Sequence, residues 1–285
     1  PEGHRFPMEK YSMLRAALLR KALLSPSELF EPKLATREEL LLAHSEDYVD
    51  SFTDGTVDRM IMRRIGFPWS EALVKRSYAS VGGAICAAVE ALHNGISGNL
   101  SGGTHHAMRN GGEGYCVFND LAVVANLFLG HGWVKRVAII DLDVHQGNGN
   151  SEILGGNPNV FILSLHGAKN YPFRKIPSTI DVDLPDNTND DDYLFALQYF
   201  LPMVFDFKPD IVLYQTGVDA LKEDALGRLA MTHNGLERRD EIVMTECWLR
   251  GIPLSLALGG GYAKPIEQTV EAYCGTYRML REVYG

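Results

Sequence analysis

Cysteines are few in this sequence, and no two of them are closely spaced. Its 285 residues include four, Cys86, Cys116, Cys247 and Cys274, and no CxxC motif. A disulfide framework or a thiolate metal site would need closely spaced pairs, so the pattern argues against both and favours a reducing compartment. We therefore expect a cytoplasmic protein.

Long apolar runs are also missing. No stretch approaches the roughly 20 residues that a bilayer-spanning helix needs, so we expect no association with membranes. The first ten residues are polar and contain proline, unlike a secretory signal peptide. The chain begins with Pro1 rather than Met, so we expect the natural protein to extend upstream.

Positive charge is in deficit. Lys and Arg number 27 against 36 Asp and Glu, which gives a formal net charge of −9. Nucleic acids and anionic membranes bind clustered cations, so this balance argues against both as partners. It is compatible with cationic substrates such as lysine-rich tails or polyamines. It gives no indication of the oligomeric state.

The sequence shows no repeat, low-complexity tract or long linker. Hydrophobic residues make up 46% of the chain, enough for a large core. We therefore expect one domain over residues 1–285. Helical spacing of apolar residues predicts four helices, at Lys10–Leu24, Leu73–Leu92, Asp192–Phe205 and Arg238–Arg250.

Short, fully apolar runs predict four strands, at Val137–Ile140, Val160–Leu165, Ile211–Tyr214 and Pro253–Leu258. Their alternation with helices predicts an α/β fold with a central, mostly parallel sheet covered by helices on both faces. Polar motifs follow three of these strands directly. Because ligands of open parallel sheets bind at the carboxyl ends of the strands, we expect these motifs to form one site.

The first motif contains Asp141, Asp143 and His145 at alternate positions, so their side chains lie on one side of an extended segment. Asp219 follows a second strand and can reach the same place. Three such ligands leave a position open for water or substrate, and they suit zinc, ferrous iron or manganese. The alternative is a solvated strand end followed by a turn histidine.

Two further motifs can supply proton transfer and oxyanion stabilisation. His105 and His106 follow Gly102 and Gly103, which permit the turn needed to direct both rings into one cavity. Tyr262 follows three glycines, and its phenol could donate to a developing oxyanion. The alternatives are a pair of surface histidines and an ordinary packed tyrosine.

Taken together, these motifs resemble the histone deacetylase family of the arginase–deacetylase superfamily. The similar segments occur in the family's order: GGTHHA, NGGEGYCVFND, VAIIDLDVHQGNG, ILSLHG, TGVDALKEDALG and LALGGGY. The opening PEGHRFPMEKY is similar as well, and the wording DLDVHQGNG and GFPW looks closest to class IV and its bacterial relatives. The resemblance implies a single-domain arginase–deacetylase fold.

The resemblance also implies residue roles. For a catalytic zinc site it implies the metal ligands Asp143, His145 and Asp219, the general base His106, its electrostatic partner His105, the orienting Asp141 and the oxyanion donor Tyr262. For the walls of the substrate channel it implies Gly114, Tyr115 and Phe173, with Leu226 at the position that is acidic in polyamine-selective members. For a structural potassium site it implies the ligands Asp141, Asp143, His145, Ser164 and Leu165.

Two positions depart from the class I pattern. Asn148 stands where class I enzymes have the carboxylate partner of the second histidine, which should make His106 less basic. Near Phe67-Pro68-Trp69 no aspartate matches the rim residue that holds the substrate backbone. Grip on a peptide should therefore differ from that of class I enzymes.

The resulting hypothesis is an amidohydrolase with one zinc ion per chain, acting on acetyl- or longer acyl-lysine in proteins or peptides. One alternative is a deacylase of small amines such as acetylpolyamines; Leu226, which offers no ion pair to a second amine, favours the first interpretation. A third possibility is an arginase-like dinuclear manganese hydrolase, which would need further ligands, and a fourth is a non-catalytic acyl-lysine binding protein.

Overall fold

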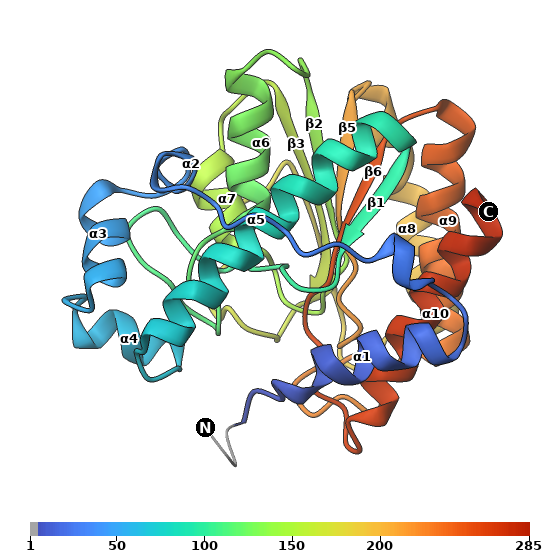
Figure 1. Ribbon diagram of the computed structural model, residues 1–285. Coiled ribbons are helices and arrows are strands. Elements are labelled where there is room, and N and C mark those ends of the chain that lie inside the picture. Colours follow the sequence, from blue (N-terminus) through green and yellow to red (C-terminus); the bar gives the residue numbers. More distant parts are fainter. Residues whose placement is uncertain (1–4) are drawn as a thin grey trace.

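The computed structural model describes residues 5–285, and within them one sheet forms the middle layer of the molecule (Figure 1). Its six strands are all parallel and lie in the order β1-β6-β5-β2-β3-β4. The strands are β1 (Ile96–Asn99), β2 (Val137–Asp141), β3 (Val160–Gly167), β4 (Ile180–Leu184), β5 (Ile211–Gln215) and β6 (Leu254–Ala257).

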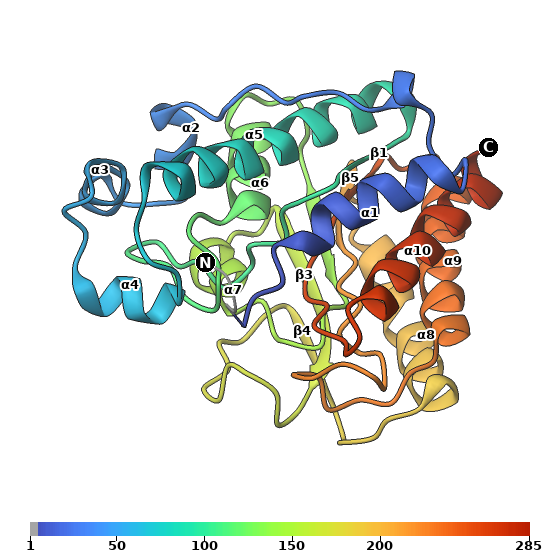
Figure 2. The same cartoon turned by 60° about the horizontal axis from the view of Figure 1, so that its bottom comes forward.

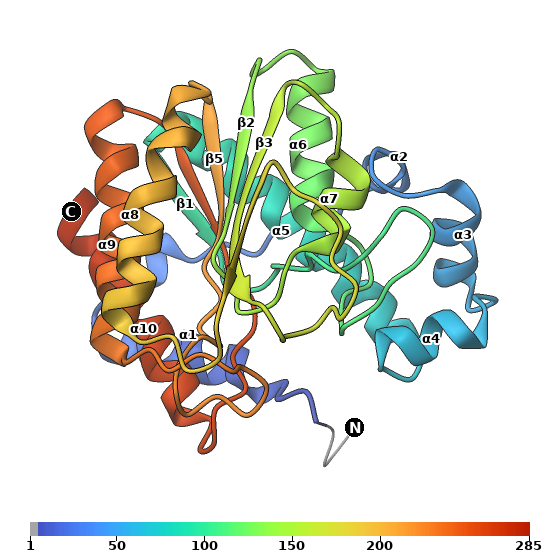
Figure 3. The same ribbon diagram turned by 180° about the vertical axis from the view of Figure 1, so that it is seen from behind.

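Helices cover both faces of this sheet (Figures 1 and 3). One face packs against α1 (Glu9–Arg20), α8 (Asp190–Asp206), α9 (His233–Arg250) and α10 (Glu267–Tyr284), the other against α5 (Glu71–Asn94), α6 (Asp120–Gly130) and α7 (Asn148–Leu154). The remaining short helices are η1 (Pro26–Glu28), α2 (Arg37–Leu41), α3 (Glu46–Asp54) and α4 (Arg59–Ile65). The prediction of a parallel sheet flanked on both faces is confirmed.

Strand β2 shows why the central strands are apolar throughout. Ala138 and Ile140 join the core under α8–α10, whereas Val137 and Ile139 join the core under α5 and α6. Side chains alternate between the two faces of a strand, and here both faces are covered. All of β2 is therefore buried.

The main helices begin and end at residues with the expected local chemistry. The Ser70 hydroxyl caps α5, and Gly95 ends that helix in the left-handed conformation. The Asn189 side chain caps α8, whose first turn contains three aspartates that favour the positive end of the helix dipole. Within the described residues, no helix combines the length and apolar character that crossing a membrane requires.

Candidate active site

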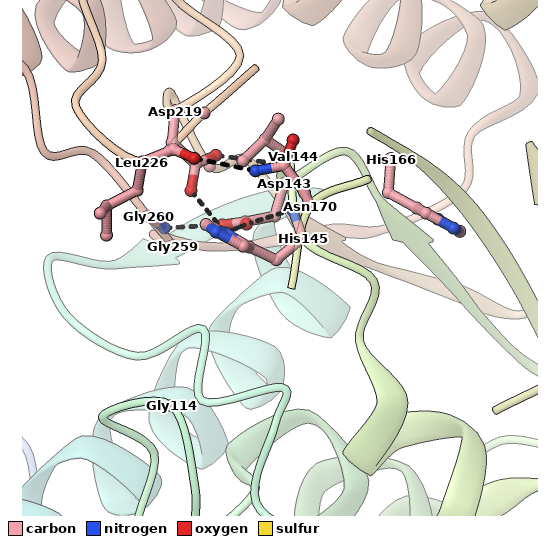
Figure 4. A network of polar contacts seen from close by, with 12 residues as sticks. Gly114, Asp143, Val144, His145, His166, Asn170, Asp219, Leu226, Gly259 and Gly260 are labelled. Atoms are coloured by element: carbon pink, nitrogen blue, oxygen red, sulfur yellow. Dashed lines mark hydrogen bonds and ion pairs between the residues drawn. The ribbon is translucent and has the colours of Figure 1, made fainter. Parts of the chain in front are cut away.

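Asp143, His145 and Asp219 meet at the carboxyl ends of β2 and β5 (Figure 4). The His145 Nδ1 atom lies 2.9 Å from Asp143 Oδ1 and 3.0 Å from Asp219 Oδ2. One ligand atom from each residue lies within 4.8 Å of the others, and all three side chains are buried. Among the described residues, this is the group that satisfies the geometry of a metal site.

Neighbouring backbone holds the two carboxylates in place. The Val144 N–H donates to Asp219 Oδ1 at 2.9 Å, and the Gly260 N–H donates to Asp143 Oδ2 at 2.6 Å. A Cβ atom at position 260 would lie 1.6 Å from Asp219 Oδ2. The glycine run before Tyr262 thus lets the segment that follows β6 pass directly against the acidic cluster.

The charge of this buried cluster suits a bound cation. Burial and the nearby charge of Asp143 raise the pKa of Asp219 to about 7. Burial opposes a charge on His145, but hydrogen bonds to Asp143 and Asp219 outweigh it and raise its pKa to about 10. The buried carboxylates of Asp143 and Asp219 therefore favour the protonated form of the His145 imidazole. A divalent ion would offset both carboxylates more completely, and the two-oxygen, one-nitrogen donor set fits such an ion.

His105 and His106 lie in a turn beside this cluster, with ring centroids 4.1 Å apart. The His105 Nδ1 atom lies 2.8 Å from Asp141 Oδ2, and the His106 Nδ1 atom lies 2.7 Å from Asn148 Oδ1. Against the effect of burial, Asp141 and Asp143 raise the pKa of His105 to about 8.

The second histidine differs from the first. Burial, reinforced by the positive charges of His105 and His145, lowers the pKa of His106 well below its usual range. At neutral pH the first ring therefore carries a charge and the second is neutral. That is the division of labour expected between an electrostatic group and a general base.

Tyr262 lines the same cavity as the two histidines. Its backbone N–H donates to Asp224 Oδ2 at 2.6 Å, which fixes the end of the glycine run. Burial and the nearby carboxylates of Asp219 and Asp143 raise the pKa of the phenol well above its usual range. The hydroxyl therefore keeps its proton and can donate it in a hydrogen bond.

A cavity of about 530 Å³ leads to these residues, and Gly114, Tyr115, Leu226 and Phe173 all line it. Gly114 has a φ of +58°, and a Cβ atom there would lie 2.7 Å from His106 Cδ2, so the wall can approach the histidine only as glycine. Figure 4 shows Gly114 across from the cluster and Leu226 beside Asp219.

Phe173 lines this cavity, and 90% of its surface is exposed to solvent. Tyr171, two residues earlier, packs edge-on against His106 with ring centroids 5.0 Å apart. Tyr171 was not predicted as a site residue. Both aromatic residues of this loop line the cavity, and which of them contacts His106 depends on the loop's path, which residue patterns do not specify.

Lys10 was also missed. Its side chain is 2% exposed, and its ammonium group donates to the carbonyl oxygens of Gly259 at 3.1 Å and Gly261 at 3.4 Å. The same group lies 5.0 Å from the centre of the Tyr262 ring. A signal was present in the sequence, because Lys10 shares the inward face of α1 with Leu14.

The residues expected to hold potassium lie at the ends of two adjacent strands. The β2–β3 register places Asp141 opposite Ser164, and Leu165 is buried in β3. The Ser164 hydroxyl lies 2.9 Å from His166 Nδ1. Figure 4 shows His166 well apart from the Asp143 cluster. Potassium binding stays a prediction.

Comparison with known proteins gives a consistent result. A family model described as the histone deacetylase domain matches residues 4–276. An uncharacterized protein of Picosynechococcus is 42% identical over 100% of this chain and 95% of its own length. Histone deacetylase 2 of Arabidopsis thaliana is 32% identical over 94% and 72%, and the acetoin utilization protein AcuC of Staphylococcus aureus is 30% identical over 92% and 73%.

Solved structures agree. The crystal structure of an HDAC homolog from Aquifex aeolicus superposes with a TM-score of 0.84 at 27% identity, covering 99% of this chain and 80% of that one. A second structure, of an HDAC homolog complexed with SAHA, superposes with a TM-score of 0.86 at 28% identity and the same coverage.

Proposed function

This chain belongs to the histone deacetylase family, and we propose that it is a zinc-dependent amidohydrolase that removes acetyl or longer acyl groups from the lysine side-chain amine of proteins or peptides. The observation that carries the proposal is the buried cluster of Asp143, His145 and Asp219 in a cavity also lined by His106 and Tyr262. These are the ligands, base and hydrogen-bond donor that amide hydrolysis requires.

In the proposed mechanism each side chain has one task. Zinc held by Asp143, His145 and Asp219 would act as a Lewis acid and lower the pKa of water. The neutral His106 accepts a proton from the attacking water and returns it to the departing amine. Tyr262 donates to the oxyanion that develops on the amide carbonyl. His105, kept charged by Asp141, stabilises the same negative charge.

Leu226 supports lysine in a peptide over a small polyamine as the source of the amine. It lines the cavity and its backbone accepts a hydrogen bond from Asn170 at 2.9 Å. An apolar side chain here offers no ion pair to a second ammonium group. Deacylation of acetylpolyamines is the second candidate function.

A dinuclear manganese hydrolase and a non-catalytic acyl-lysine binding protein have less support. The manganese hydrolase needs a second set of ligands, and within residues 5–285 the geometric criteria select a single group. A binding protein would not need the charged and neutral histidine pair. Structural potassium at Asp141, Asp143, His145, Ser164 and Leu165 is part of the proposal. So is a cytoplasmic location, which the four free cysteines support.

A substrate panel tests the proposal. Acetyl-, trifluoroacetyl- and myristoyl-lysine peptides and an acetylpolyamine would be incubated with zinc-loaded protein, and free amine would be quantified. We expect release from at least one peptide at a higher kcat/KM than from the polyamine. Faster polyamine turnover would favour the second candidate function. Binding of peptide without release would favour a non-catalytic binding protein.

A further inference from the structure

The cavity has a lining opposite in sign to the protein as a whole. Six of its lining residues are lysine or arginine and one is acidic, although the chain has a net charge of −9. The acidic one is Asp143, which belongs to the metal cluster. The cationic ones are Arg5, Arg63, Arg64, Arg76, Lys169 and Arg228.

Four of these cations lie beside the channel walls. Arg63 and Arg64 close α4, and the Arg64 carbonyl accepts a hydrogen bond from Gly114 at 3.0 Å. Both arginine side chains are exposed and form no ion pair with another described residue. Lys169 and Arg228 share one carboxylate, Asp186, at 3.5 and 2.7 Å. We call the part of the cavity lined by Arg63, Arg64, Lys169 and Arg228 its mouth. Positive charge at the mouth is thus largely unopposed.

Granting the proposed amidohydrolase function, we infer that the mouth selects acyl-lysine within acidic segments of proteins or peptides. Acylation removes the charge of the lysine, so the cationic lining does not repel the substrate side chain itself. Acidic neighbours are attracted, whereas basic tails are repelled. Hydrolysis restores the charge of the lysine, so the same cations favour release of the product.

Three acetyl-lysine peptides of equal length test this inference, with acidic, neutral or basic residues around the acetyl-lysine. Both kcat/KM and the dissociation constant would be measured at low and high salt. We expect the acidic peptide to exceed the basic one by at least about tenfold at low salt, and the difference to shrink as salt screens the charges. Equal values for the three peptides, or a preference for the basic one, would overturn the inference.

Charge-reversal variants locate the effect. Arg63→Glu and Arg64→Glu should reduce or invert the preference for the acidic peptide. Arg59→Glu is the matched control, because Arg59 is exposed on the same helix but does not line the cavity. An equal change in all three variants would contradict a role of the mouth. If no peptide is hydrolysed, the proposed function fails, and the dissociation constants still decide the charge preference.

A separate observation concerns the partner of His106. The Asn148 amide nitrogen donates to Glu113 Oε1 at 2.7 Å, while the Asn148 carbonyl oxygen lies 2.7 Å from His106 Nδ1. Asn148 is 1% exposed, so its amide has few further partners. Burial, and after it the interaction with the Glu113 side chain, raises the pKa of the nearby Tyr171.

These contacts fix the position of one proton. A carboxylate only accepts hydrogen bonds, so the amide group facing Glu113 must be the NH2. The carbonyl oxygen of Asn148 then faces His106, and the His106 Nδ1 must carry the hydrogen. Its Nε2 is left with a free lone pair. An amide turned by 180° would place the hydrogen on Nε2 instead, and the ring could not act as a base through that atom.

We propose that Glu113 is a positioning residue that sets the tautomer of His106 through Asn148. Glu113→Ala should lower kcat by about tenfold or more, within the range of a lost general base, with little change in KM. In an Asn148→Asp background the same substitution should cost nothing, because an aspartate at 148 accepts hydrogen bonds through either oxygen.

Kinetics in the two backgrounds and NMR decide the matter. A purely structural role of Glu113 would lower kcat equally in both backgrounds, and that result would overturn the proposal. Long-range ¹H–¹⁵N spectra of the neutral histidines should show the hydrogen of His106 on Nδ1 in the wild type and partly on Nε2 in Glu113→Ala. An unchanged tautomer in that variant would also overturn it.

Discussion

His105 and His106 are adjacent in the sequence, but Asp141 faces one ring and Asn148 faces the other. The carboxylates of Asp141 and Asp143 stabilise the charged form of His105 against burial, whereas burial and the nearby positive rings disfavour a charge on His106. The pKa values of the two histidines consequently move in opposite directions. One residue type thus provides both a cation and a base.

Replacing His106 by alanine tests its role as the base. We expect kcat to fall by roughly 10²–10⁴, the range attributed to general acid–base catalysis, with metal content unchanged. Steady-state hydrolysis of an acetyl-lysine peptide measures this effect, and metal analysis by mass spectrometry is the control. Turnover near the wild-type value would contradict the assignment.

Tyr262→Phe removes one hydroxyl and keeps the ring. Because the phenol is expected to donate only to the developing oxyanion, kcat should fall by about 10²–10³ while KM changes little. The same peptide assay measures both constants. A rise in KM at constant kcat would indicate that the hydroxyl binds substrate and does not stabilise the transition state.

At the scale of elements, helix α1 supports the active-site loop although it is distant in sequence. Figure 2 shows α1 alongside α10, and Lys10 in its first turn reaches the carbonyl oxygens of Gly259 and Gly261. The loop that carries Tyr262 therefore depends on a contact across about 250 residues of chain.

Lys10→Met should leave those carbonyl oxygens without a donor. We expect the free energy of unfolding to fall by about 1–3 kcal/mol and kcat to fall as Tyr262 loses its fixed position. Denaturant unfolding and peptide hydrolysis measure the two effects. Lys21→Met is the matched control, because it breaks only the half-exposed pair with Glu271, and exposed pairs contribute about 0–1 kcal/mol. Equal losses in both variants would contradict a specific role of Lys10.

His44 is hydrogen-bonded to two other segments of the chain, and its buried imidazole is expected to make the stability of the protein depend on pH. Its Nε2 accepts from the Asn119 N–H at 2.8 Å, and its Nδ1 lies 2.9 Å from the Met108 carbonyl oxygen. Burial lowers the pKa of His44 from 6.5 to about 4. Between these values the unfolded chain binds a proton that the folded chain does not, so stability falls as the pH falls.

The difference corresponds to at most about 3 kcal/mol lost between pH 6.5 and pH 4. Denaturant unfolding across this range measures the slope. A His44→Gln variant has no titrating group at this position and should show a shallower dependence. The prediction fails if the two proteins lose stability in parallel.

Most of the parallel core could be predicted from the sequence, because β2, β3, β5 and β6 are apolar on both faces. The edge strands could not. Strand β1 contains Gly98 and Asn99, and β4 alternates with Asp181 and Asp183, so neither has the composition of a buried strand. Helix α7, which begins at Asn148 directly after Gly147, was not predicted either.

At the scale of the whole molecule, the rule that ligands bind at the carboxyl ends of parallel strands correctly brought Asp143 and Asp219 together. The contacts of Lys10, Glu113 and Tyr171 were not predicted, since each reaches its partner in the site through the path of the chain. Net charge was misleading as well. The molecule is acidic, but the lining of its cavity is basic.

Metal-dependent deacylation is the central claim, and one measurement tests it most directly. The protein would be stripped with a chelator, reloaded with one equivalent of zinc and assayed on an acetyl-lysine peptide, beside an Asp219→Asn variant treated identically. We predict no release from the stripped protein, recovery on reloading, and weak or absent recovery in the variant. Full activity in the stripped protein, or none after stoichiometric zinc binding, would contradict the account.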